Sequence, residues 1–146
     1  MSAITGLLQR AESRQRKRFL RRDSYASWNA RPGSERALET LLEELPGREG
    51  AEDRRAWWHL VLAHAATCDW ARAAQAEKER AIGTLSAQAL ADVAVEEVRG
   101  LEASRLHFLM GGAISQICLG MVSHDQAAST IRAHVRGVLA GHDEAA

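Results

Sequence analysis

The chain has 146 residues and a mass of 16.0 kDa, which is the size of a single domain, and its formal net charge at pH 7 is zero. With 27 Ala and 16 Leu against 12 Val and Ile together, the composition favours helices and argues against an all-β fold. An apolar content of 46% and a charged content of 26% are those of an ordinary globular domain, which excludes wholesale disorder.

The first predicted helix covers about residues 3–22 and belongs to the most basic part of the chain. Residues 1–36 hold nine Lys and Arg against three Asp and Glu, whereas residues 37–146 hold ten against sixteen. We therefore divide the chain into a basic N-terminal helix or arm (1–33), a helical bundle domain (34–141) and a frayed tail (142–146). The arm suits two arrangements: contact with the acidic body of this protein or of a neighbouring subunit, or contact with nucleic acid.

Two further helices are expected before residue 68. Ser34 is a suitable N-cap for a short helix that carries Leu38, Leu41 and Leu42 on one face, and Pro46-Gly47 ends it. The next helix, about Glu52 to Thr67, is apolar nearly all round, which predicts burial on every side.

The second half of the chain continues the helical pattern. A helix that begins near Asp69 is expected to end at Gly83-Thr84, and a fifth segment runs from Leu85 towards Met110. Gly111-Gly112 either breaks that segment or allows a close helix crossing. One stripe of the fifth segment has helical spacing: Leu90, Ala94, Val98, Leu101, Arg105 and Phe108.

The final segments contain an uncharged run and a helix start. Leu106 to Val122 is 17 residues without a formal charge, too short for a membrane span, so we expect a core or subunit-interface helix. Ser123 and Gln126 have the spacing of a capping box, and Gly141 is a suitable end for the helix that follows. The chain is thus predicted to be all-α, a bundle of about five to six helices built around an αα-hairpin.

The hairpin is predicted over residues 57–85. Thr67-Cys68-Asp69 forms the break, Asp69 is expected to cap the second helix, and the ring of Trp70 is expected to fold back over the hairpin and become buried. Trp57, Leu60, Trp70 and Ala73 have relative spacings that resemble those of a tetratricopeptide repeat. The Asp69-Trp70 break and the run Glu77-Lys78-Glu79-Arg80 also resemble the FliT-type flagellar export chaperones. Either resemblance implies an adaptor or chaperone-like role.

No pattern in the sequence indicates catalysis, a metal site or a cofactor. Nucleophile and phosphate-binding motifs are missing, and His64 and Cys68, four residues apart, are interpreted as a core histidine and a buried thiol. Two cysteines cannot supply a disulfide framework, and the N-terminus lacks the apolar core of a secretory signal. We therefore expect a cytoplasmic protein that is not an enzyme and that does not associate with membranes.

The predicted function is binding to another protein, for which a helical segment is a suitable partner element. Homo-oligomerisation is expected through Leu106 to Val122. Four tryptophans are the candidate partner-binding residues: Trp28, Trp57, Trp58 and Trp70. The alternative is a nucleic-acid-binding protein or a subunit of a nucleoprotein complex. In that case the binding residues would be the cations of the first helix: Arg14, Arg16, Lys17, Arg18, Arg21 and Arg22.

Overall fold

The structure is a computed structural model that describes residues 33–47 and 52–143. Within these ranges the chain is all-α, as predicted, with five helices packed together and no strand. The helices are α3 (Gly33–Glu43), α4 (Glu52–His64), α5 (Asp69–Ala89), α6 (Glu96–Cys118) and α7 (His124–Asp143). The basic helix expected over residues 3–22 lies outside the described residues.

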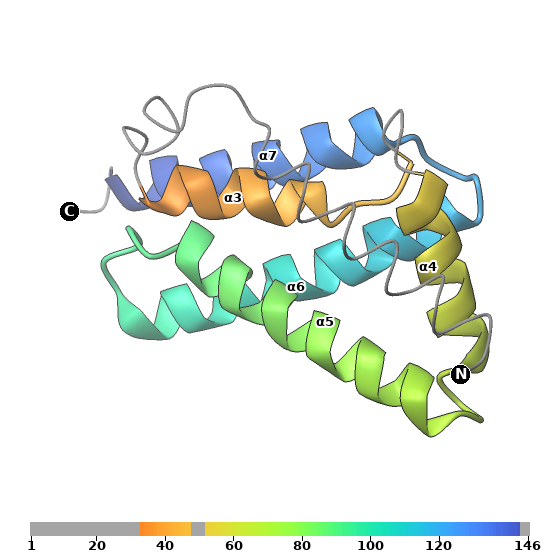
Figure 1. The fold of residues 1–146 in the computed structure, drawn as a ribbon. Helices are drawn as coiled ribbons and strands as arrows, with labels where there is room; N and C mark the ends of the chain where they lie inside the picture. Colours follow the sequence, from red (N-terminus) through yellow and green to blue (C-terminus); the bar gives the residue numbers. More distant parts are fainter. Residues whose placement is uncertain (1–32, 48–51, 144–146) are drawn as a thin grey trace.

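Helix α3 packs most extensively on α5, and α5 also packs along α6 in the opposite direction (Figure 1). Helices α3 and α7 run in opposite directions and are joined by the Arg132–Glu39 ion pair. Helix α4 lies across one end of the molecule, where it meets α5 and α6. Helix α6 has three neighbours, because α4, α5 and α7 all contact it.

A single hydrophobic core joins the helices. The apolar face predicted for α3 is confirmed, since Leu38, Leu41 and Leu42 are all buried. Each fully buried side chain of this size contributes about 1.5–3 kcal/mol relative to an exposed one. Other helices contribute large, fully buried side chains to the same cluster: Trp58, Val61, Ile82, Leu106, Met110, Ile131 and Val135.

Helix α3 ends at Glu43, shortly before the predicted stop at Pro46-Gly47. Gly47 has a φ of +84°, a conformation that side chains disfavour. A β-carbon at this position would also lie 3.0 Å from Cγ2 of Ile117, so the glycine allows the loop to pass close to α6.

The predicted boundary between the fourth and fifth segments is wrong. Helix α5 continues through Gly83-Thr84 to Ala89, and the chain turns at residues 90–95 instead. A mid-helix glycine costs only about 1 kcal/mol relative to alanine, which packing overcomes here. Leu90 and Val93 are fully buried and anchor the turn, and Nη1 of Arg99 donates a hydrogen bond to the Val93 carbonyl at 3.2 Å.

Helix α6 likewise runs uninterrupted through Gly111-Gly112 to Cys118. A β-carbon on either glycine would have no described atom within 4 Å, so the close helix crossing considered for this pair is absent from the described structure. The close approach lies instead at Gly83, where an added β-carbon would be 3.5 Å from Nδ1 of His107.

The αα-hairpin of α4 and α5 is present, but the predicted cap by Asp69 is wrong. The N-cap of α5 is Cys68, without a side-chain cap, and Asp69 is the first helical residue. Arg72 stabilises the turn, because its guanidinium donates to the carbonyls of Ala65 and Ala66 at 3.4 Å each and pairs with Asp69 at 3.3 Å.

Helix α4 is buried on one side only, so the expectation of burial all round is also wrong. Trp57, Trp58 and Val61 are in the core, whereas Leu62 is 40% exposed. The reason is its position across one end of the bundle, where a single face of the helix meets its neighbours.

The capping box at the start of α7 is confirmed. The Ser123 amide donates to Oε1 of Gln126 at 2.9 Å, and the Gln126 amide donates to Oγ of Ser123 at 3.1 Å. The predicted end at Gly141 is wrong by two residues, since α7 extends to Asp143.

Candidate functional site

Helix α6 has two opposite apolar faces. One face is buried against the rest of the bundle: Glu102, Leu106, Met110, Ile114, Ile117 and Cys118. On the other face Leu101 and Phe108 are 53% and 82% exposed, and Leu119, which directly follows the last helical residue, is 72% exposed. Because these three residues are 7 and 11 positions apart, they lie within about 20° of one line along the helix.

We call this exposed line the α6 stripe. Its members are spaced alternately four and three residues apart, and all are exposed: Leu101, Arg105, Phe108, Gly112, Ser115 and Leu119. Large apolar side chains also flank both ends of the helix, since Val95 is 52% and Met121 67% exposed. Contiguous apolar exposure of this kind is typical of interaction surfaces.

The α6 stripe contains a single charged residue, Arg105. Its guanidinium Nη1 donates to Oε1 of Glu102 at 2.5 Å. Glu102 is buried and follows Leu101 in the sequence. Glu102 also lies 3.6 Å, Oε2 to Nε2, from His134 on α7. The charge of Arg105 is therefore balanced within the molecule, which leaves the stripe apolar in character.

The predicted tryptophan site is divided by the fold. Trp57 and Trp58 are 7% and 2% exposed, and their rings meet edge to face with centroids 4.9 Å apart. The indole nitrogen of Trp58 donates to the Glu44 carbonyl at 3.3 Å. Burial makes both residues part of the core, so neither presents a ring to a partner at the surface.

Trp70 is exposed, contrary to the burial expected for its ring. It is 39% exposed and its ring centroid lies 6.2 Å from that of His64. The neighbouring residue, Ala71, is the one that faces the core at the start of α5. Trp28 and the six cations of the first helix lie outside the described residues, so the nucleic-acid alternative remains a prediction.

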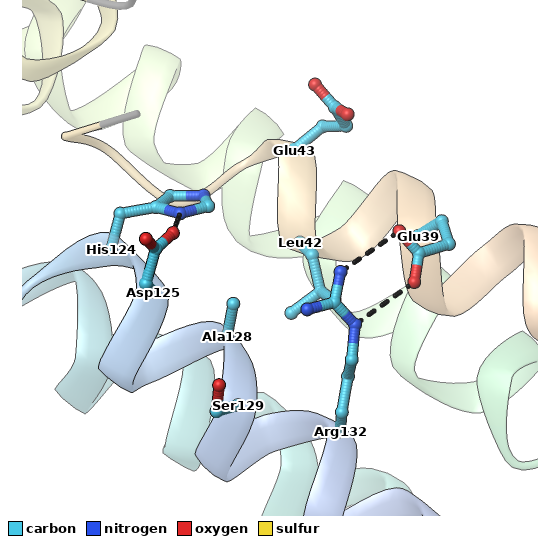
Figure 2. A pocket seen from close by; sticks show the side chains of 8 residues that line it. All are labelled: Glu39, Leu42, Glu43, His124, Asp125, Ala128, Ser129 and Arg132. Atoms are coloured by element: carbon cyan, nitrogen blue, oxygen red, sulfur yellow. Dashed lines mark hydrogen bonds and ion pairs between the residues drawn. The ribbon is translucent and has the colours of Figure 1, made fainter. Parts of the chain in front are cut away.

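A small cavity of about 260 Å³ lies between α3 and α7 (Figure 2). Arg132 reaches from α7 to Glu39 on α3, where Nε and Nη2 donate to the two carboxylate oxygens at 3.2 Å each. Nδ1 of His124 lies 3.2 Å from Oδ1 of the adjacent Asp125. The cavity is smaller than the 300 Å³ or more that is usual for small-molecule sites. The Arg132–Glu39 pair spans it, which favours a role in joining two helices.

Side chains that could bind a metal do not cluster elsewhere in the described structure. Across the two described ranges, no three His, Cys, Asp or Glu side chains converge as a metal site would require. Burial raises the pKa of the Cys118 thiol above its ordinary value, and the charge of Arg55 opposes that effect in part. A raised pKa leaves less of the nucleophilic thiolate at neutral pH.

The sequence contained the signal for the α6 stripe without revealing its orientation. Leu101, Arg105 and Phe108 were recognised as one helical stripe, but nothing in their spacing distinguishes a buried stripe from an exposed one. The uncharged run Leu106 to Val122 contributes to both faces: Leu106 and Met110 are buried, whereas Phe108 and Leu119 are exposed.

No described helix has an apolar stretch long enough to cross a membrane. Comparison of the chain with protein-family models, with curated proteins and with solved structures gave no match.

Proposed function

We propose that this protein works by binding another protein, without catalysis, and that the α6 stripe is the binding surface. The observation that supports the proposal is the exposure of Leu101, Phe108 and Leu119 on the side of α6 opposite the core. Such a surface gains free energy when a partner removes it from water, at roughly 25 cal/mol per Å² of apolar area.

Phe108 is the expected energetic centre of the contact. It is the most exposed large apolar residue described, and it lies near the middle of the α6 stripe. Interface energy concentrates on aromatic residues at the centre of a patch, while less important contacts around them exclude water. Phe108 is flanked by small or polar positions, which would leave its ring free to enter a depression on the partner.

The shape of the surface favours a helical partner element. The α6 stripe is straight and about 27 Å long, from the rise of 1.5 Å per residue over 18 residues. Packed helices approach to 8–10 Å when the side chains between them are small. Gly112 and Ser115 supply such a position on this helix.

The test is photo-crosslinking with a benzophenone amino acid at position 108 of the full chain in its cellular environment. The matched control carries the same group at position 136, an exposed position of α7. We expect a discrete protein adduct from position 108 that disappears in the additional variant Leu119→Asp. Adducts equal at both positions, or insensitive to Leu119→Asp, would overturn the proposal.

A further inference from the structure

The six positions of the α6 stripe are spaced symmetrically about position 110. Leu101 and Leu119 are equally far from that centre, as are Arg105 and Ser115, and as are Phe108 and Gly112. In an antiparallel two-fold pair centred there, each of these positions lies opposite its counterpart, because residue i of one copy contacts j of the other and j contacts i.

We propose that the partner of the α6 stripe is a second copy of this chain, bound with the two α6 helices antiparallel and centred near residue 110. This inference rests on the proposed function and names the partner for the same surface. The alternating spacing of four and three residues is that of the contact seam in a pair of supercoiled helices. Two such helices crossing at about 20° remain in contact along the full stripe.

Antiparallel pairing places the largest side chain of each copy against the smallest of the other. Phe108 of one copy would pack over Gly112 of the second copy, twice per dimer. A β-carbon built on Gly112 has no described atom within 4 Å, so the space above this glycine is open within the described chain. In a parallel, in-register pair the two Phe108 rings would clash, and the two Gly112 residues would leave an unfilled space beside them.

Charge also favours the antiparallel arrangement. Arg105 of one copy would lie opposite Ser115 of the other, whose hydroxyl can accept a hydrogen bond. A parallel pair would instead bring the two Arg105 side chains together. The Arg105–Glu102 ion pair stays within each copy, so association leaves no new charge without its partner.

The exposed area is close to what a stable dimer requires. Taking about 200 Å² for a side chain of this size, Leu101, Phe108, Leu119 and Met121 expose roughly 500 Å² per copy. Two copies would bury roughly 1,000 Å² from these residues alone, and the small residues between them bring the total towards the 1,200–2,000 Å² of standard interfaces.

The orientation can be tested with single cysteines in the full chain. In a background of Cys68→Ser and Cys118→Ala, the variants Leu101→Cys and Leu119→Cys are treated with a short bis-maleimide, separately and as a mixture. We expect a crosslinked dimer from the mixture and little from either variant alone. Crosslinking within each separate variant but not between them would overturn the antiparallel arrangement.

The surface can be tested by light scattering with size-exclusion chromatography at about 0.1 mM chain. We expect twice the 16.0 kDa chain mass for the unaltered protein, and a dissociation constant at least about tenfold higher for Phe108→Ala. Gly112→Leu should raise the thermal midpoint of the monomer through helix propensity while weakening the dimer. The matched control is Gly100→Leu, which is also in open space on α6 but off the α6 stripe, and which should leave the dimer unchanged.

The outcomes separate this inference from the proposed function. A monomer at every concentration overturns the dimer. If position 108 then still crosslinks to a different protein in a Leu119-dependent way, the binding function stands with another partner. If neither self-association nor such an adduct is found, both proposals are overturned. Equal weakening by Gly112→Leu and Gly100→Leu would also contradict the dimer.

Discussion

Gly83 of α5 lies against the imidazole ring of His107 of α6, with 3.5 Å between the ring Nδ1 and the place where a β-carbon would stand. Nε2 of the same ring contacts Oε2 of Glu79 at 2.5 Å, one turn earlier on α5. The glycine and the carboxylate thus hold one histidine between them, and the contact fixes how closely α5 and α6 approach.

Substitutions at Gly83 should have effects of opposite sign. A distance of 3.5 Å is ordinary van der Waals contact, so Gly83→Ala should fit and raise the free energy of unfolding by about 0.5–1 kcal/mol through helix propensity. Gly83→Leu should displace His107 and lower the free energy of unfolding by about 1–3 kcal/mol. Urea denaturation measures both. Destabilisation by alanine would show that the two helices are closer than the structure has them.

Ser123→Ala should destabilise the protein by about 0.5–2 kcal/mol, because the amide of Gln126 loses its acceptor at the start of α7. Ser123→Asp retains an oxygen acceptor and should restore most of the loss. Thermal unfolding by circular dichroism provides the comparison. An equal loss in both variants would mean that the serine contributes something other than capping.

The tryptophans should differ sharply in their contribution to stability. Trp58→Ala removes a nearly fully buried ring and should cost about 3–5 kcal/mol. Trp70→Ala removes a ring at the surface and should cost no more than about 1 kcal/mol. Denaturation monitored by far-ultraviolet circular dichroism is suitable, since it does not depend on tryptophan fluorescence. Comparable losses would contradict the division of the set into core and surface residues.

The Glu39–Arg132 pair should couple α3 to α7 weakly. Its side chains are 23% and 37% exposed, so a double-mutant cycle with Glu39→Gln and Arg132→Gln should give a coupling free energy of about 0.5–1 kcal/mol. The coupling should diminish in about 1 M salt because exposed charges are screened. The matched control is Arg136→Gln with Glu39→Gln, for which no coupling is expected. Equal coupling in the two cycles would exclude a specific pair.

The two cysteines should react at different rates with a thiol reagent. Cys68 is partly exposed and should be labelled first, whereas Cys118 is buried and its thiol pKa is raised by that burial. Rates measured in Cys68→Ser and Cys118→Ala variants, under native conditions and in denaturant, provide the comparison. Faster native labelling of Cys118 than of Cys68 would contradict its burial.

The raised pKa of the Cys118 thiol also predicts that stability depends on pH. Because the folded-state pKa of Cys118 is raised, the native state keeps the thiol proton to higher pH than the unfolded chain does. Its stabilising contribution is complete below the thiol's unfolded pKa of about 8.5 and is lost as pH rises through the folded value. The free energy of unfolding should therefore fall less steeply above about pH 8.5 in Cys118→Ala. Identical slopes would contradict the shift.

Particular residues show where sequence reasoning succeeds. The leucine face of α3, the stop at Pro46-Gly47 and the Ser123–Gln126 box depend on local spacing and local hydrogen bonds, so each was predictable. Gly83 was misinterpreted as a helix end, and Gly111-Gly112 is neither the break nor the close crossing that were considered for it. The same residue type ends a helix, allows a close crossing or faces open space according to what lies beside it.

What the sequence determined by itself is the all-α class, the positions of most helices and the presence of apolar stripes, since these follow from residue propensity and periodicity. Only the tertiary structure decided which stripe is covered. Helix α6 has apolar residues on two opposite sides, and α4, α5 and α7 pack on only one of them. Periodicity is a property of a single helix, whereas burial is a property of its neighbours. Phe108 is therefore exposed and Met110 buried, although both belong to the same apolar run.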